Sequence, residues 1–349
     1  MNSLVIYGAT GYVGRLVAQL AVRRGLRPVL AGRDLRRLAA LRIDAPVRAA
    51  SLADPAALDR LLVDASVLLN AAGPFAETQR PLLDACLRTG THYLDLSGEA
   101  AEFLDVRGRD DELVRAGVMA MPGVGFGVVP TDAVAVHLAG RLPLARRLEL
   151  SFVTSGQVSR GTLGTLLAGL GEPGVQRRDG RLVPVRAGAA QRGIPADGRT
   201  VRVVTNPWRA DVVSAGQSTG IPDVSTFFAV PAPLRLALRV APAAPWLLTS
   251  PAGRRLRAAL LRRIPEGPTP AQLDAGRSLV HGLATDDAGT VVEAVLTGPD
   301  PYRYSAYTAV ELLARTAAGT VRPGYRTPAQ VHGPDVALTT PGTVLRDLR

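Results

Sequence analysis

Short apolar runs alternate with amphipathic stretches over the first third of the chain. The run Leu4–Tyr7 ends at a glycine cluster, and apolar residues then recur at helical spacing from Val13 to Ala21. These two patterns predict a buried strand followed by a helix. Further strands are expected at Pro28–Ala31, near Val47, and at Val67–Asn70, Tyr93–Leu96 and Val118–Met121, with helices at Leu35–Leu41, from Asp54-Pro55 onward, at Glu77–Arg88 and near Glu102–Ala116. Strands that alternate with helices predict an α/β fold with a doubly wound parallel sheet.

The pattern changes after Met121. The segment Pro122–Pro130 is rich in glycine and proline, which predicts a hinge between domains. Extended runs without helices between them predict a mixed or antiparallel sheet beyond the hinge. These runs lie at Arg147–Thr154, Leu182–Arg186, Thr200–Val204 and Val224–Val230, a hairpin is expected at Ser278–Leu296, and helices are expected at Leu234–Ile264 and Tyr307–Ala318. We therefore expect a first domain over residues 1–125, a second α+β domain with a mixed sheet over 126–320, and a tail, 321–349, that packs back on the first domain.

Composition narrows the class of protein. A length of 349 residues fits two domains better than one core. The net charge is +11, yet the sequence contains no lysine, so all 41 basic residues are arginines. Aromatic residues make up only 4% and are scattered, whereas nucleic-acid binding needs clustered charge with aromatic side chains that stack on bases. The arginine excess therefore indicates coding bias, and we expect no nucleic-acid partner.

Cysteine and histidine usage predicts a chain without metal or disulfide. The single cysteine, Cys86, excludes an internal disulfide and a zinc site built from cysteines. The histidines lie far apart, at His92, His137, His281 and His332. The expected first strand begins within four residues of the first residue, and the longest uncharged run, Ala116–Thr131, is too short to span a bilayer. We expect no signal peptide and a cytoplasmic protein.

A glycine motif stands between the first expected strand and the first expected helix. It consists of Gly8, Ala9, Thr10, Gly11, Tyr12, Val13 and Gly14, with a glycine at every third position. In a Rossmann domain such glycines allow a tight turn, close approach of the backbone to a diphosphate, and close packing of the helix on the strand. The diphosphate would lie at the helix N-terminus, where N–H groups and the helix dipole favour an anion. The motif therefore predicts an N-terminal domain that binds a dinucleotide.

The end of the second expected strand indicates which dinucleotide. An NAD-binding domain carries Asp or Glu there to hold the ribose 2′-hydroxyl, but this strand ends in Ala31-Gly32-Arg33. A guanidinium at that place favours the 2′-phosphate of NADP. The alternative is that Arg33 is one of many solvated arginines.

Two further loops follow strands that end at the same edge of the expected sheet. The first contains Asn70, Ala71, Ala72 and Gly73, whose small residues let a ribose or nicotinamide lie against the backbone, unless this is an ordinary connection. The second runs from Tyr93 to Glu99. Tyr93 and Glu99 are the candidate catalytic residues, because they could position a nicotinamide or relay a proton. An acidic residue at this place can equally cap the next helix.

The chain resembles the saccharopine dehydrogenase-like oxidoreductases, in particular the branch of trans-acting enoyl reductases. The segments that carry the resemblance are Val5–Gly14, Ala31–Arg33, Asn70–Phe75, Ala85-Cys86, Gly90–Asp95, Gly98-Glu99, Pro122–Asp132, Ser218–Pro222, Gly267-Pro268 and Pro323–Pro328. The resemblance implies that the glycine motif, Arg33 and the Asn70–Gly73 loop contact NADP. It also implies that the second domain shapes a substrate cleft and forms a homodimer.

The resemblance further implies an NADPH-dependent reductase that transfers hydride to a C=C or C=N bond of a small-molecule or carrier-bound substrate. The enoyl reaction is preferred because the closer resemblance points to it. The chain departs from the family at Gly125-Phe126-Gly127, where relatives usually carry Gly-Phe-Asp. The carboxylate that could face the cleft from this loop is therefore missing.

Several alternatives remain beside this hypothesis. The Tyr-Lys mechanism of short-chain dehydrogenases is excluded because the chain has no lysine. Gly216–Gly220 has the spacing of a hydrolase nucleophile elbow, but Ile221-Pro222 argues against the required strand, turn and helix. The basic segment Pro245–Ile264 could contact a membrane surface or a carrier protein, or could pack its leucines on the second domain. A saccharopine-type dehydrogenase acting on an imine and a non-catalytic NADP(H)-binding protein also remain open.

Overall fold

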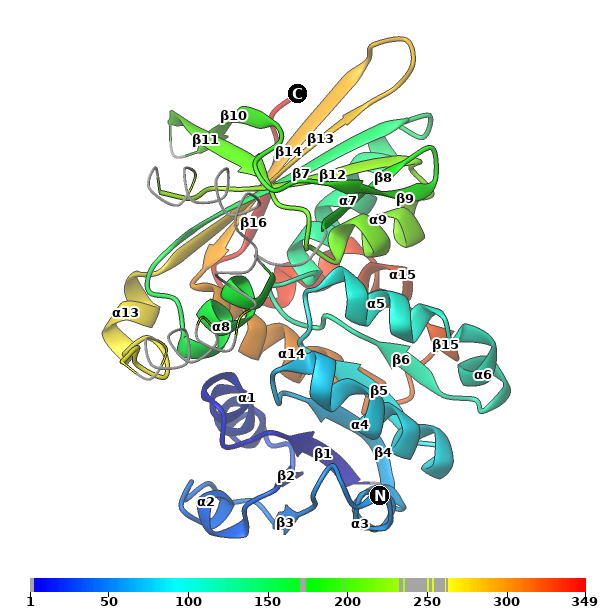
Figure 1. The fold of residues 1–349 in the computed structure, drawn as a ribbon, viewed down its shortest axis with the longest axis vertical. Helices are drawn as coiled ribbons and strands as arrows, with labels where there is room; N and C mark the ends of the chain where they lie inside the picture. Colours follow the sequence, from blue (N-terminus) through cyan, green and yellow to red (C-terminus); the bar gives the residue numbers. More distant parts are fainter. Residues whose placement is uncertain are drawn as a thin grey trace. The chain divides into compact units, whose positions relative to one another are not determined.

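The computed structural model of the chain, drawn in Figure 1, divides into two compact units. It describes residues 3–169, 174–196, 198–231, 235, 250, 253, 261 and 263–349. The first unit comprises Met1–Ala133 and Tyr302–Pro341, and the second comprises Val134–Pro301 and Gly342–Arg349. The helix expected at Leu234–Ile264 and the basic segment Pro245–Ile264 fall outside the described residues except at single positions.

The first unit is built on a sheet of seven parallel strands. The strands are β1 (Ser3–Tyr7), β2 (Pro28–Gly32), β3 (Val47–Ala49), β4 (Ala65–Asn70), β5 (His92–Asp95), β6 (Met119–Met121) and β15 (Gly324–Tyr325). Their order is β15-β6-β5-β4-β1-β2-β3, so chain order reverses between β1 and β4. This is the strand order of a Rossmann fold with one added strand. The expected N-terminal parallel sheet is confirmed.

Helices connect these strands as expected from their start and stop signals. They are α1 (Tyr12–Arg23), α2 (Leu35–Ala39), α3 (Pro55–Leu62), α4 (Phe75–Thr89), α5 (Ala100–Arg107), α6 (Asp110–Arg115), α14 (Pro301–Ala317), α15 (Pro328–His332) and the 3-10 helix η2 (Pro334–Thr339). The Asp54 carboxylate accepts a hydrogen bond from the Ala57 nitrogen at 3.0 Å and so caps α3. The helix expected near Glu102–Ala116 is two helices, because the first ends at Gly108.

The second unit contains a mixed sheet. Its strands are β7 (Arg147–Ser155), β8 (Gly174–Arg178), β9 (Arg181–Val185), β10 (Gln191–Ala196), β11 (Arg199–Thr205), β12 (Asp223–Phe228), β13 (Arg277–Thr285), β14 (Val291–Pro299) and β16 (Val344–Asp347). The order is β10-β11-β12-β7-β13-β14-β16, with β8 and β9 attached at β12. Only β12 and β7 pair in parallel; the other strands pair antiparallel. The described helices of this unit are α7 (Val129–Arg141), shared with the first unit, α8 (Arg160–Gly169), α9 (Asp211–Thr219) and α13 (Pro270–Ala275). The expected mixed sheet is therefore confirmed.

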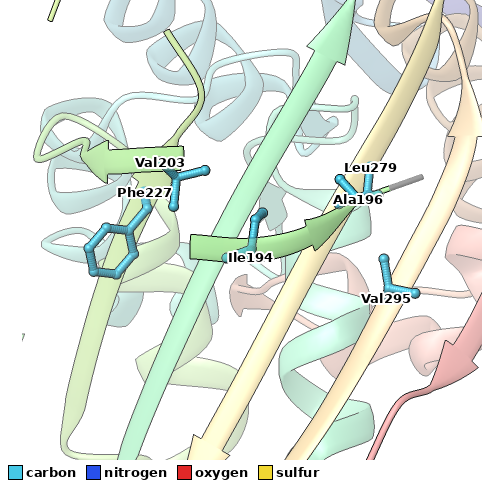
Figure 2. Packing of buried hydrophobic residues seen from close by; sticks show 6 residues of the cluster. All are labelled: Ile194, Ala196, Val203, Phe227, Leu279 and Val295. Atoms are coloured by element: carbon cyan, nitrogen blue, oxygen red, sulfur yellow. The ribbon is translucent and has the colours of Figure 1, made fainter. Parts of the chain in front are cut away.

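The hairpin of β10 and β11 folds over the sheet and closes part of its core. Figure 2 shows Ile194 and Ala196 of β10 together with Leu279 of β13 and Val295 of β14, with Phe227 of β12 beside Val203 of β11. In β10 the residues between these two are exposed, which is the alternation of a strand with one buried face. The apolar face of the hairpin thus completes the core of the second unit.

The division into units differs from the one expected at residue 125. All of Pro122–Pro130 is buried except the half-buried Gly127, and α7 begins inside this segment and crosses the boundary. The segment is held within the first unit because the Thr308 hydroxyl donates to the Val124 carbonyl at 2.9 Å. Helix α14, expected in the second domain, accordingly belongs to the first unit. The tail is split, since β15 joins the first sheet and β16 joins the second.

Within the described residues, no helix combines the length and the apolar character that a bilayer crossing requires.

We expect Gly282→Ala to destabilise the second unit. A Cβ atom at Gly282 in β13 would collide with Val134 and would lie 2.7 Å from a methyl group of Leu138, both in α7. Overpacking of this kind costs about 1–3 kcal/mol of unfolding free energy. In Gly140→Ala, on the same helix, the new methyl meets no atom within 4 Å, so stability should be unchanged or rise by about 0.5–1 kcal/mol. Urea denaturation measures both, and equal effects of the two variants would contradict the packing argument.

Candidate active site

The carboxyl ends of the parallel strands bring four loops to one edge of the first sheet. These loops follow β1, β4, β5 and β6. Ligands of open α/β sheets bind at this edge, where the strand order reverses. In this chain the reversal lies between β1 and β4. The edge is therefore the candidate active site, and its geometry follows from the residues of the four loops.

The glycine motif is packed so closely that two of its glycines tolerate no side chain. A Cβ atom on Gly8, whose φ is +86°, would lie 2.6 Å from the Ala72 nitrogen. A Cβ atom on Gly14 would collide with the Gly8 carbonyl and would lie 3.1 Å from the Ala9 Cα atom. The first glycine thus brings the β1 and β4 loops together, and the last brings α1 onto the turn.

Helix α1 presents its first turn at this edge. Gly11 occupies its N-cap, and no side chain caps the helix there. A Cβ atom on Gly11 would have as its nearest neighbour the Gly8 carbonyl at 3.3 Å, so this position is less crowded than the other two glycines. The arrangement fits a diphosphate, because a helix N-terminus supplies both N–H donors and a favourable dipole.

Arg33 stands directly after β2 with an exposed side chain. No ion pair involves Arg33 among the described residues, so its guanidinium is available for an anion. The following residue, Asp34, is not aimed at a ribose in the way of an NAD-binding carboxylate. Its side chain accepts a hydrogen bond from the Arg37 nitrogen at 3.1 Å and caps α2. The end of β2 therefore has the chemistry of a 2′-phosphate site.

The β4 loop is held by the fully buried side chain of Asn70. The Asn70 Oδ1 atom accepts from the Ala72 nitrogen at 3.0 Å, and its Nδ2 atom donates to the Thr78 hydroxyl at 3.0 Å. Thr78, in the first turn of α4, donates in turn to the Ala72 carbonyl at 2.6 Å. Beyond these bonds, a Cβ atom on Gly73 would meet nothing within 4 Å. The loop is thus rigid at Ala72 and open at Gly73.

Asp95, at the end of β5, is a fully buried carboxylate that collects five hydrogen bonds. Its Oδ2 atom accepts from the Tyr93 hydroxyl at 2.9 Å and from Gln79 Nε2 at 3.0 Å. Its Oδ1 atom accepts from the nitrogen and the hydroxyl of Ser97, at 2.9 and 2.6 Å, and from the Gly123 nitrogen at 2.9 Å. One carboxylate therefore joins β5, α4 and the β6 loop. The role of Asp95 was not visible in the sequence, where a lone Asp at a strand end resembles a helix cap.

The two candidate catalytic residues lie in different environments. Tyr93 is fully buried, donates to Asp95 and accepts from Asn70 Nδ2 at 3.2 Å. Burial and the Asp95 charge raise the pKa of Tyr93 well above its usual value. This environment favours a structural task over proton transfer to a substrate. Glu99 is half-buried, directly precedes α5, and its Oε2 atom accepts from the Gly98 nitrogen at 2.8 Å.

A third acidic residue, Glu102, lies one turn beyond Glu99 and was not singled out from the sequence. It is half-buried in the first turn of α5, and its Oε2 atom is buried with no hydrogen-bond partner among the described residues. Burial, followed by the charge of Glu99, raises the pKa of Glu102 to about 7. A carboxyl group with that pKa holds and releases a proton near neutral pH. Only its spacing from Glu99 could have indicated this in advance.

The loop that departs from the family pattern lies beside these acids. A Cβ atom on Gly127 would be 3.6 Å from both the Gly98 Cα atom and the Ser97 carbonyl, which is an ordinary contact. A side chain at this position would therefore lie against the β5 loop. With glycine there, the described carboxylates of this neighbourhood are those of Asp95, Glu99 and Glu102.

Other candidate chemistries find no support in the structure. Ser218 lies near the C-terminal end of α9, not on a sharp turn between a strand and a helix, so Gly216–Gly220 is not a nucleophile elbow. Among the described residues, no group of His, Cys, Asp and Glu has an arrangement that could hold a metal ion.

The strand order, the glycine loop and Arg33 define a dinucleotide-binding domain of the Rossmann class. Residues 4–121 match the family model of the saccharopine dehydrogenase NADP binding domain, and through this domain the chain belongs to that family. The resemblance seen in the sequence and the expected cofactor, NADP, are thereby confirmed.

The relatives of the chain include trans-acting enoyl reductases. The chain is 33% identical over 150 residues to that of Mycobacterium ulcerans, which covers 40% of this chain and 35% of the relative. It is 34% identical over 159 residues to that of Mycobacterium leprae, covering 42% of this chain and 38% of the relative. The match thus spans less than half the length of these relatives. Over 100% of both chains the structure is similar to a saccharopine dehydrogenase (L-Glu forming) from Saccharomyces cerevisiae, with a TM-score of 0.67 and 14% identity, which shows a shared fold.

We expect Glu102 to make the stability of the protein fall as the pH rises. Its pKa is raised from 4.5 to about 7 in the folded state, so the protonated form is favoured by folding. The contribution is complete below about pH 4.5 and is lost as the pH rises through 7. Because the side chain is partly in water, Glu102→Gln should gain only about 1 kcal/mol relative to the wild type between pH 5 and pH 8.

Denaturant unfolding at both pH values measures this gain. The control is Glu77→Gln, which replaces an exposed glutamate in the first turn of α4. A Glu102→Gln variant whose stability follows the same pH profile as the wild type would contradict the assignment.

Proposed function

We propose that the chain is an NADPH-dependent reductase that reduces the C=C bond of an enoyl substrate, either a small molecule or an acyl group on a carrier. The observation that carries this proposal is the combination of the glycine loop with an unpaired Arg33 at the edge of a saccharopine dehydrogenase-type NADP-binding domain. The printed names of the relatives, trans-acting enoyl reductases, support the reaction type.

The binding residues divide along the strand order. The first turn of α1 holds the diphosphate, with Gly8, Gly11 and Gly14 keeping side chains out of its way. Arg33 neutralises the 2′-phosphate at the end of β2. Asn70, Ala71, Ala72 and Gly73 lie at the end of β4, in the half of the sheet that receives the nicotinamide.

The residues of the chain orient the reactants and handle one proton. When bound, NADPH supplies the hydride, and reduction of an enoyl group adds this hydride to one carbon and a proton to its neighbour. We assign the proton to the half-buried pair of Glu99 and Glu102, because Glu102 holds a proton near neutral pH. Tyr93, whose hydroxyl is buried between Asn70 and Asp95, positions the loops. Both assignments are part of the proposal.

We expect Arg33→Ala to weaken NADPH binding about 10- to 100-fold and to leave NADH binding unchanged. The magnitude is that of a charge-assisted hydrogen bond to a phosphate. Arg27→Ala is the matched control, because Arg27 is also exposed and lies just before the other end of β2. Fluorescence titration measures each dissociation constant. Equal losses for NADPH and NADH would contradict a 2′-phosphate site at Arg33.

The reaction itself is tested with the full chain, NADPH and a series of α,β-unsaturated acyl thioesters of increasing chain length. We expect consumption of NADPH with formation of the saturated thioester, identified by mass spectrometry. Consumption with an imine formed from an amino acid and an aldehyde, and none with the thioesters, would replace the enoyl proposal with an amino-acid dehydrogenase. Tight NADPH binding with no turnover of either class would favour a non-catalytic NADP(H)-binding protein.

A further inference from the structure

The Tyr93 hydroxyl lies between two groups that serve different loops of the candidate active site. It accepts a hydrogen bond from Asn70 Nδ2 at 3.2 Å and donates one to Asp95 Oδ2 at 2.9 Å. We propose that Tyr93 and Asp95 are positioning residues that hold the β4 and β5 loops in one arrangement and thereby set the affinity for the nicotinamide half of the cofactor. This inference rests on the proposed binding of NADPH.

On one side, Tyr93 fixes the orientation of the Asn70 amide. With Nδ2 directed to Tyr93 and to the Thr78 hydroxyl, Oδ1 is directed to the Ala72 nitrogen at 3.0 Å. Ala72 is also the residue that a Cβ atom on Gly8 would touch. The position of Ala72 therefore depends on a side-chain amide whose orientation is set by two buried hydroxyl groups.

On the other side, Asp95 holds the loops that follow β5 and β6. Both its bonds to Ser97 and its bond to the Gly123 nitrogen end at Oδ1, whereas Tyr93 and Gln79 occupy Oδ2. The Val124 nitrogen also donates to the Asp95 carbonyl at 2.7 Å. Because each oxygen is engaged, a change at Tyr93 is passed to the carboxylate and is not absorbed by a free lone pair.

The strand order determines which part of the cofactor responds. In a Rossmann fold, one mononucleotide half lies over β1, β2 and β3 and the other over β4, β5 and β6. Asn70, Tyr93, Asp95 and the Gly123 nitrogen all belong to the ends of β4, β5 and β6. The glycine loop and Arg33 belong to the first half. Loss of the Tyr93 hydroxyl should therefore weaken contacts to the nicotinamide half and leave the adenosine half intact.

The test compares two ligands on one variant, Tyr93→Phe, which removes a single oxygen atom. NADPH spans both halves of the edge, whereas 2′,5′-ADP occupies only the adenosine half. We expect the dissociation constant for NADPH to rise about 3- to 10-fold, the effect of one buried hydrogen bond, and that for 2′,5′-ADP to change less than about twofold. Isothermal titration calorimetry measures both without any turnover.

Thr91→Val is the matched control. Thr91 is fully buried just before β5, at the opposite end of that strand from Asp95, and its hydroxyl lies 3.2 Å from the carbonyls of Leu62 and Ala65. It should lose a comparable amount of stability and bind both ligands as the wild type does. If Tyr93→Phe does not fold, Thr78→Val releases Ala72 from α4 and should show the same ligand dependence, while Thr78→Ser, which keeps the hydroxyl, should restore affinity.

The outcomes separate this inference from the proposed function. Wild-type protein that binds neither NADPH nor 2′,5′-ADP would overturn the proposed function and the inference with it. Wild-type protein that binds NADPH, with a Tyr93→Phe variant that either binds it equally well or loses both ligands to the same extent, would overturn the inference alone. A Thr91→Val variant that matches Tyr93→Phe on both ligands would do the same, because the effect would then be one of general stability.

Discussion

The candidate active site depends on a carboxylate that is buried without a cation. Removing an ionised carboxyl group from water costs several kcal/mol unless donors replace the lost hydration. At Asp95 five donors do so, and no Lys or Arg is among them. Because the donors come from β5, α4 and the loop after β6, the cost of burial is offset only when all three elements are in place. The charge thereby requires one arrangement of the sheet edge.

The same edge is shaped by backbone contact as well as by side chains. Gly8 and Gly14 admit no Cβ atom, so the β1 turn, α1 and the β4 loop approach one another at main-chain distance. Such an approach exposes N–H groups to a diphosphate and leaves no room for flexible side chains. The Asn70 amide connects this backbone region with the Asp95 network through Tyr93. Binding of an anion and placement of the nicotinamide half are therefore properties of one connected structure.

Three acidic groups at this edge illustrate how environment separates roles. Asp95 is fully buried with every oxygen engaged, so it serves structure. Glu102 is half-buried with an oxygen that has no partner among the described residues, and burial beside Glu99 raises its pKa to about 7. Of the two environments, the second suits proton transfer near neutral pH. The absence of a carboxylate at Gly127 leaves this task to α5 under the proposed function.

Local signals in the sequence determined the parallel sheet, the glycine loop, Arg33 and the Asp54 cap, because each depends on residues a few positions apart. The NADP-binding domain was therefore predictable. The division into units was not, because Pro122–Pro130 resembles a linker until Ser305, 179 residues beyond Phe126, receives the Phe126 nitrogen in a hydrogen bond. Likewise, only tertiary structure shows that Tyr93 is a buried bridge and that Glu102 has a raised pKa. Hydrogen-bond partners and dielectric environment come from residues that are distant in sequence, and hydrophobic periodicity carries no information about them.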